Sequence, residues 1–262
     1  MSVPPLSARA WLDDFFAAYY RRRPVNATFI GVHEYDDQLP DFSPPGVAAT
    51  VTEMASLLRT RRGGDVAPPT SEAEAIDLRL AEHFLMLQSW EFASYHFQQG
   101  NPCVYTGEAI FGVLSLFLRP FAPLAERIKA AIARMNAIPA FLTVAAANIR
   151  SAPPAWTERA IRECTGAMHF LCSGIDMLMV DEGISNPRFR DAATTARAAF
   201  ADYQAFLNST VRADPTDGYG CGGEAFELYL RLGHELAMSG DEIERYAREQ
   251  FAESHARLVE GA

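Results

Sequence analysis

Residues 123–142 read PLAERIKAAIARMNAIPAFL, and this stretch decides how the chain folds. Ile128, Ile132 and Met135 recur at the spacing that places side chains on one face of an α-helix. Pro139 removes one backbone donor from that helix, but the apolar pattern resumes directly after it. We therefore expect a long helix that is kinked at Pro139 and does not end there.

Helical periodicity and capping residues continue in both directions from this stretch. Ser71 and Glu74 form the Ser-x-x-Glu pattern of a capping box ahead of a long helix, which Gly-Asn-Pro at 100–102 is expected to end. A short, nearly all-apolar helix from Glu108 to Leu118 is expected at the centre of the fold. Further helices are expected to begin near three residues: Thr157, Asn186 and Ser239. Strand patterns with hairpin turns do not occur. The sequence predicts an all-α, multi-helix bundle of roughly eight to ten helices.

The segment 213–223, ADPTDGYGCGG, is the one clear interruption of the helical pattern. Four of its eleven residues are glycine, and glycine favours loops because it loses the most conformational freedom in a regular element. We therefore predict three parts. They are a helical bundle over 1–212, a loop or hinge over 213–223, and a C-terminal helical pair over 224–262 that packs on the bundle or leads into a second half.

Charge and composition exclude two classes of partner. The 262 residues include 23 basic and 33 acidic side chains, for a net charge of −10, whereas binding to nucleic acid needs clustered Lys and Arg. The start of the chain, MSVPPLSARAW, lacks the order of a signal peptide. The longest apolar run, residues 109–118, is too short to span a bilayer. We expect no nucleic-acid partner, no membrane partner and a cytoplasmic location.

Residues 29–44, FIGVHEYDDQLPDFSP, place one histidine, one glutamate and three aspartates between two helical segments. In one interpretation this is an acidic turn whose aspartates cap neighbouring backbone donors. In the other, part of the stretch faces a cleft and contacts substrate. The candidate cleft residues are His33, Tyr35, Asp36 and Asp37.

The sequence contains no complete metal-binding motif. A zincin needs a helical His-Glu-x-x-His, but in the two His-Glu pairs of this chain the second histidine position holds Asp37 and Met238. The Glu-x-x-His pairs of di-iron bundles do not occur either. An aspartate-rich magnesium motif is matched only weakly by DDQLPD, because a proline interrupts it. We therefore predict no catalytic residue, no metal ligand and no cofactor in this chain.

Several motifs taken together resemble one bacterial family. They are RRRPVNATFIGVHEYDDQLPDFS at 21–43, RPFAPL at 119–124, IPAFL at 138–142, PPAWT at 153–157 and GEAF at 223–226. As a set they resemble the first half of the domain-of-unknown-function 885 family, and they cover nearly all of the chain.

The resemblance implies a helical, zinc-peptidase-like protein. The family's presumed metal motif, His-Glu-x-x-Pro-Gly-His-His, lies in the second half of the family pattern, and nothing in this chain matches it. Zinc activates water by lowering its pKa from about 15.7 to about 7. What the resemblance implies is a non-catalytic N-terminal part that forms the wall of a peptide-binding cleft. Zinc would then be bound only in a longer form, completed by the C-terminal half of the same protein or by a partner chain.

Two alternatives stay open, so the sequence does not decide whether the chain is an enzyme. One is a stand-alone helical binding or scaffold protein that keeps the cleft for a small molecule, a peptide or a partner chain. The other is a non-zinc enzyme built on the truncated scaffold. An exposed apolar patch where a second half would dock favours the peptidase-like interpretation, and a polar, closed surface there favours the stand-alone protein.

Overall fold

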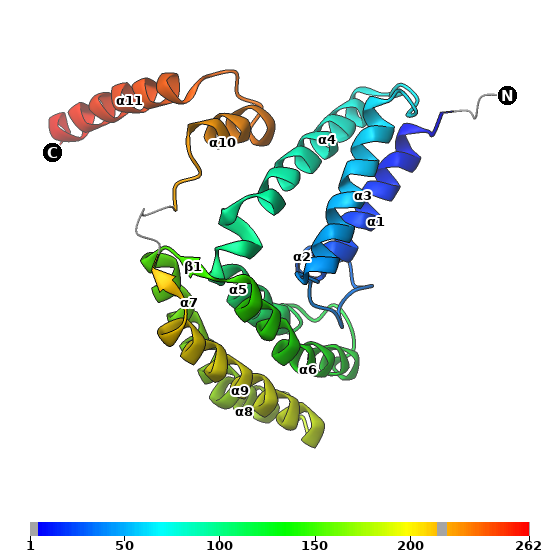
Figure 1. Ribbon diagram of the computed structural model, residues 1–262, viewed down its shortest axis with the longest axis vertical. Helices are drawn as coiled ribbons and strands as arrows, with labels where there is room; N and C mark the ends of the chain where they lie inside the picture. Colours follow the sequence, from blue (N-terminus) through cyan, green and yellow to red (C-terminus); the bar gives the residue numbers. More distant parts are fainter. Residues whose placement is uncertain (1–4, 214–218, 262) are drawn as a thin grey trace.

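The computed structural model describes residues 5–213 and 219–261, which are almost entirely helical (Figure 1). Within them the chain forms eleven α-helices, which confirms the all-α prediction with one helix more than the expected range. The helices are α1 (Ala8–Arg22), α2 (Pro24–Ile30), α3 (Pro44–Arg62), α4 (Glu72–Ala93), α5 (Pro102–Leu114), α6 (Leu124–Asn148), α7 (Pro154–His169), α8 (Ile175–Asp181), α9 (Pro187–Ser209), α10 (Gly223–Leu228) and α11 (Gly240–Glu260).

Short elements join or extend these helices. Three π-helical turns lie at helix ends: η1 (Tyr95–Gln99), η2 (Phe170–Gly174) and η3 (Tyr229–Gly233). Two strands of two residues each, β1 (Ser151–Ala152) and β2 (Arg212–Ala213), pair in parallel, with Ser151 opposite Arg212. This pairing ties the end of α9 to the start of α7.

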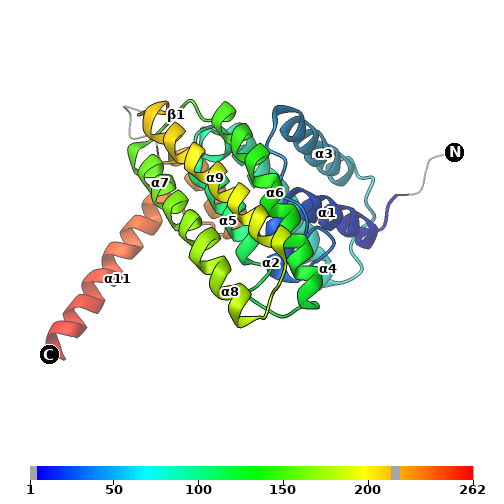
Figure 2. The ribbon, with the colours of Figure 1, turned by 90° about the horizontal axis from the view of Figure 1, so that it is seen from below.

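The main core lies among α5, α6, α7 and α9, which run side by side (Figure 2). Helix α6 packs against α5 and α9, and α7 packs against the same two helices. Met135 and Ile138 of α6 and Phe189 and Phe200 of α9 are fully buried. Burying side chains of this size contributes roughly 1.5–3 kcal/mol each, so this layer is the main source of stability.

Helix α6 is 25 residues long and continues through Pro139, as the resumed apolar pattern predicted. By length and composition alone it is apolar enough to cross a membrane. Its contacts are nevertheless those of a core helix, because ten of its residues are buried in the bundle. Two of these ten are arginines, Arg127 and Arg134, and Arg134 positions the loop after α2.

The central short helix begins earlier than predicted. We expected Glu108 to Leu118, whereas α5 begins at Pro102 and ends at Leu114. The side chain of Asn101 caps the helix by accepting a hydrogen bond from the backbone N–H of Cys103 at 3.0 Å. Pro102 then occupies the first position, where a missing N–H costs nothing. The Gly-Asn-Pro signal that ends the preceding segment therefore also begins α5.

A second layer consists of α1, α3 and α4. Helix α1 packs against both α3 and α4. Trp11 of α1 is fully buried, and its indole Nε1–H donates to the Leu57 carbonyl of α3 at 3.1 Å. Phe15 of α1 meets Phe84 of α4 edge to face, with ring centroids 6.1 Å apart. The α2 helix and the loop that follows it lie where this layer meets α5 and α6.

The C-terminal elements differ from the rest of the chain in how they pack on the bundle. Of the predicted loop 213–223, residues 214–218 lie outside the described residues, Ala213 belongs to β2 and Gly223 begins α10. The π-helical turn η3 packs on α4, but α11 projects from the body in both views (Figures 1 and 2). The predicted helical pair is thus present, and the division of the chain into three parts stays a prediction.

Candidate functional site

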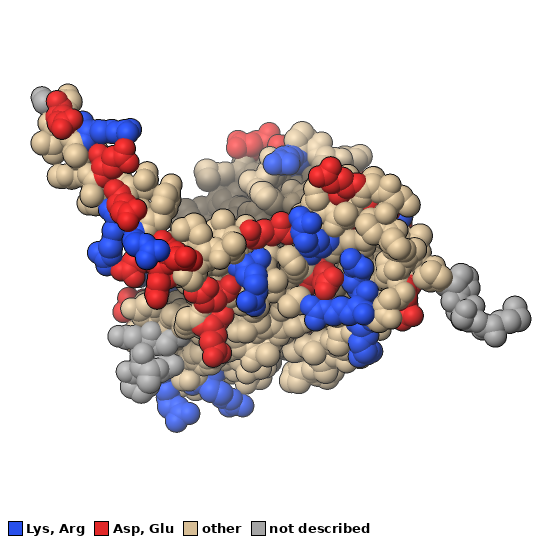
Figure 3. All heavy atoms as spheres, turned by 90° about the horizontal axis from the view of Figure 1, so that it is seen from above, with Lys and Arg blue, Asp and Glu red and all other residues tan. Residues whose placement is uncertain are grey.

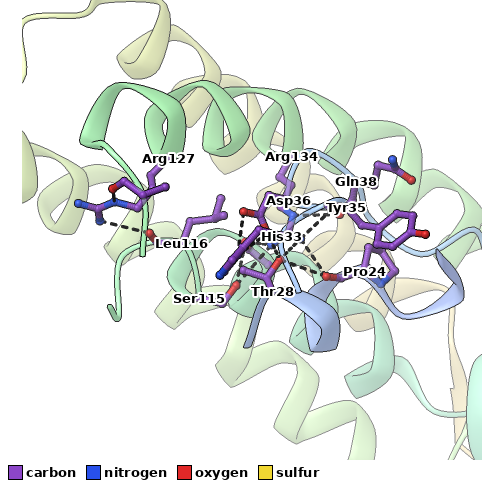
Figure 4. Close-up of polar contacts among 12 residues, drawn as sticks. Pro24, Thr28, His33, Tyr35, Asp36, Gln38, Ser115, Leu116, Arg127 and Arg134 are labelled. Carbon is purple, nitrogen blue, oxygen red and sulfur yellow. Dashed lines mark hydrogen bonds and ion pairs between the residues drawn. The ribbon is translucent and has the colours of Figure 1, made fainter. Parts of the chain in front are cut away.

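A buried arginine holds the loop that follows α2. Arg134 of α6 has no exposed surface, and its guanidinium is the centre of the polar network in Figure 4. It donates to the Thr28 hydroxyl at 2.7 Å. It also donates to four backbone carbonyls, those of Pro24 at 3.1 Å, Tyr35 at 3.2 Å, Gln38 at 2.9 Å and Gly112 at 2.6 Å. One side chain therefore joins α2, the loop, α5 and α6.

Asp36 supplies the negative charge beside this arginine. The Thr28 hydroxyl, which accepts from Arg134, donates to Asp36 Oδ1 at 2.5 Å. Burial lowers the pKa of Arg134 to about 10, while the carboxylates of Asp36, Glu108 and Asp37 act in the opposite direction. The guanidinium therefore stays charged at neutral pH. Asp36 anchors the loop through two side chains, whereas the acidic-turn interpretation expected backbone donors. Asp41 is the aspartate of this stretch that accepts from a backbone N–H, that of Ser43 at 2.9 Å.

His33 extends the same network to the surface. Its Nδ1 lies 3.1 Å from Asp36 Oδ2 and 3.3 Å from Asp36 Oδ1. Its imidazole stacks on the Phe121 ring with centroids 3.7 Å apart and planes 5° apart. The side chain of His33 is 33% exposed, against 14% for Asp36. The other ring nitrogen, Nε2, has no hydrogen-bond partner among the described residues and is the ring atom that can bind another group.

An open hollow of about 670 Å³ lies beside this histidine. The loop lines it with His33, Asp36 and Asp37, and the segment that begins α6 lines it with Phe121 and Lys129. Three of the four candidate cleft residues therefore meet at one hollow. Tyr35, the fourth, does not line it and contributes its backbone carbonyl to Arg134. That any of the four contacts substrate stays a prediction.

A second polar cluster, which was not among the sequence predictions, lies where α4, α5 and η3 meet the α1–α2 junction. Arg23 donates to Glu91 Oε2 at 3.0 Å, and the Tyr229 hydroxyl donates to Glu91 Oε1 at 3.0 Å. Glu108 faces the same region, and burial raises its pKa. Its Oε2 is shielded from solvent and has no hydrogen-bond partner among the described residues.

The sequence did contain a signal for this cluster. Glu108 is the single charged residue of the apolar helix α5, and Glu91 continues an apolar helical spacing on α4. A lone carboxylate on an apolar helix face must be paired or neutralised when it is buried. The partners of Glu91, which are Arg23 and Tyr229, lie far from it in the sequence, so the pairing itself could not be predicted.

The same polar cluster attaches the C-terminal elements to the bundle. Tyr229 belongs to η3, and its bond to Glu91 joins η3 to α4. A second link follows η3, where Glu235 accepts from Arg79 at 2.6 and 3.1 Å. Both contacts, that of Tyr229 with Glu91 and that of Glu235 with Arg79, lie between α4 and the segment that leads to α11.

Comparisons with known proteins identify a family and a fold. The family described as bacterial protein of unknown function (DUF885) matches residues 24–262. A solved structure of a candidate lipoprotein of unknown function from Shewanella oneidensis superposes with a TM-score of 0.76 at 20% sequence identity. The superposition covers 93% of this chain and 45% of that chain, so this chain spans less than half the length of its structural neighbour.

These findings differ in what they establish. At 20% identity the structural likeness shows the fold alone. Among curated proteins, none matches the sequence. The family match, in contrast, extends over most of the chain and includes the loop that Arg134 holds and, apart from Arg23, the cluster around Glu91. The chain therefore belongs to the domain-of-unknown-function 885 family of bacterial proteins.

Proposed function

We propose that this chain is the non-catalytic, helical N-terminal part of a zinc-metallopeptidase-like protein and forms the wall of a peptide-binding cleft. The observation that carries the proposal is the uncovered apolar face of α11. Tyr246 is 55% exposed, and Phe251 and Leu258, which lie seven residues apart on one side of the helix, are each 73% exposed. The helix has no buried residue, and Figure 3 shows it projecting from the body.

An amphipathic helix normally covers its apolar face. Most of the stability of a helix in a protein comes from packing that face, and an isolated helix of about 20 residues is marginal in water. A large exposed apolar face therefore marks a docking surface. The structural neighbour is more than twice as long as this chain, which supports a further part of the same protein as the cover.

In this proposal the cleft wall is the surface where η3 meets α4, at the base of α11. Trp90 meets Tyr229 edge to face, with ring centroids 5.6 Å apart, and stacks beside His96 at 6.0 Å. Glu91 and Arg23 fix polar groups next to these rings. Aromatic walls with a few fixed polar groups are typical of small-ligand and peptide sites. The metal ligands would come from outside residues 1–262.

The length of the native protein tests the proposal directly. The protein would be captured from the cells that make it with an antibody against α7, and its intact mass would be measured. We expect a mass well above the 28.9 kDa of residues 1–262, with a His/Glu-rich metal motif in the additional sequence. A mass of 28.9 kDa would overturn the proposal.

Zinc content provides an independent test. Residues 1–262 produced alone are expected to bind no stoichiometric zinc and to hydrolyse no peptide, because the proposal places the groups that would activate water outside residues 1–262. Elemental analysis and a mixed-peptide hydrolysis assay would measure both. Stoichiometric zinc together with peptidase activity from residues 1–262 would refute the non-catalytic assignment.

One observation favours a second candidate function, a stand-alone helical binding protein. The hollow beside His33 is formed entirely by residues of this chain, so it needs no second half to bind a ligand. In that case α11 would pair with a partner chain, and the captured protein would have the mass of residues 1–262. We place either protein in the cytoplasm, as the sequence predicts.

A further inference from the structure

We propose that the hollow beside His33 binds a ligand with a cationic amino group, which donates a hydrogen bond to His33 Nε2. The hollow lies at the loop after α2, whereas α11 projects from the other side of the bundle (Figures 1 and 2). The site therefore goes beyond the proposed cleft and does not depend on a metal or on a second half of the protein.

The first argument is the hydrogen-bonding role of the imidazole. Asp36 is an acceptor, so the His33 Nδ1 that faces it at 3.1 Å carries a proton and donates. In a neutral imidazole the other nitrogen then has a free lone pair. Nε2 of His33 is therefore an acceptor, and it needs a donor from outside the network.

The second argument is that the acceptor is held in place before any ligand arrives. The Phe121 ring stacks on the imidazole at 3.7 Å, and Asp36 is fixed by the Thr28 hydroxyl at 2.5 Å. Thr28 is in turn fixed by the fully buried Arg134. Prior ordering of this kind lowers the entropic cost of binding.

The third argument is the charge of the lining. Glu34, Asp37 and Glu126 line the hollow, and no hydrogen bond or ion pair engages their carboxylates in the described part of the chain. Lys129, the sole lysine of the protein, is the one cation on this wall whose charge is free among the described residues. Three free carboxylates against one ammonium favour a cationic ligand and disfavour an anion.

The remaining charged groups of the lining are already engaged inside the protein. Arg127 turns its guanidinium toward the backbone carbonyls of Ala122 at 3.0 Å and Leu116 at 3.3 Å (Figure 4). Asp36 is committed to His33 and Thr28. A volume of about 670 Å³ lies in the range typical of small-ligand sites, so an alkylamine or a basic side chain of a peptide fits.

The test compares three molecules of equal length that differ in charge. Putrescine, 1,4-butanediol and succinate would each be titrated into residues 1–262, with the imidazole nitrogens followed by long-range ¹H–¹⁵N NMR. We expect a saturable shift at His33 Nε2 with putrescine only, weakened by added salt because the charges are exposed. Equal binding of putrescine and butanediol would overturn the proposal, and so would saturable binding of succinate alone.

A pair of matched variants tests the role of the histidine. His33→Phe keeps an aromatic ring for Phe121 and removes Nε2, and it is expected to weaken putrescine binding at least tenfold. His169→Phe, at an exposed position on α7, is the control and should leave the binding unchanged. Unchanged affinity in His33→Phe would overturn the assignment.

A further pair keeps the test decisive if His33→Phe does not fold. Asp37→Asn and Glu126→Gln change exposed carboxylates of the same hollow, and each is expected to weaken putrescine binding severalfold. Binding that is indifferent to both would refute the proposal. Because the measurement uses residues 1–262 alone, its failure would leave the mass test of the proposed function unaffected, and the reverse also holds.

Discussion

At the scale of single residues, Arg134 stabilises the fold through satisfied hydrogen bonds around a buried charge. Its guanidinium donates to four carbonyls and two hydroxyls from segments that are far apart in the sequence. Removing the guanidinium leaves buried carbonyl acceptors without a donor and the Asp36 carboxylate without its neighbouring positive charge. The cost of that loss exceeds the cost of lost packing.

Arg134→Met is therefore expected to lower the free energy of unfolding by about 3–5 kcal/mol. Urea denaturation followed by circular dichroism would measure it. Arg162→Met, at an exposed position on α7, is the control and should change stability by no more than about 0.5 kcal/mol. A similar effect of the two substitutions would show that the network contributes nothing.

Glu108 should make stability depend on pH. Burial raises its pKa in the folded protein, and Arg23 and Arg134 oppose this only partly. A raised folded-state pKa gives stability that is complete below the unfolded value, about 4.3, and is lost as pH rises through the folded value. Glu108→Gln does not titrate, so its stability relative to the natural protein should rise between about pH 4 and about pH 8.

Urea denaturation at the two pH values measures this difference. Glu158→Gln, on the exposed side of α7, is the matched control and should show the same difference from the natural protein at both. A Glu108→Gln variant that loses relative stability at the higher pH would mean that the carboxylate is stabilised in its charged form. That result would also remove the reason to regard Glu108 as a neutralised group.

At the scale of elements, two helices of similar length depend on different sources of stability. Helix α9 buries Phe189, Phe200 and five further residues against α6 and α7. Helix α11 buries none. It is supported by its capping box, in which Ser239 and Glu242 bond reciprocally, and by exposed ion pairs such as Arg248 with Glu244.

Equivalent substitutions in the two helices should therefore differ sharply. Phe200→Ala is expected to destabilise residues 1–262 by about 3–5 kcal/mol, because it leaves a cavity in the core. Phe251→Ala should change stability by at most about 0.5 kcal/mol, because nothing covers that side chain. Thermal or urea unfolding of the two variants would test this, and a large loss in Phe251→Ala would show that α11 packs on the body in solution.

Elements whose signals are local could be predicted from the sequence, whereas contacts between distant residues could not. Helices such as α6 and α9 follow from spacing and capping, which are local properties, and the loop after α2 was located by its composition. The arrangement of its residues was not predictable, because Arg134 lies 96 residues from Gln38 and 106 from Thr28. The start of α5 was misplaced because Asn101 and Pro102 were assigned to the end of one helix only.

At the scale of the whole molecule, the body and the α11 arm should exchange amide hydrogens very differently. In residues 1–262 alone, amides between 243 and 258 are expected to exchange rapidly, because only local contacts hold that helix. Amides of α9 should be strongly protected. If a further part of the protein covers the apolar face, protection at 243–258 should rise by at least tenfold in protein isolated from the cells that make it.

Hydrogen exchange read by mass spectrometry on both preparations decides this, with α9 as the internal control that should not change. Protection at 243–258 with a native mass above that of residues 1–262 identifies the cover as a part of the same chain. Protection at the mass of residues 1–262 identifies a partner chain and favours the stand-alone protein. Rapid exchange at 243–258 in both preparations would mean that the face is never covered, and the docking role of α11 would then be wrong.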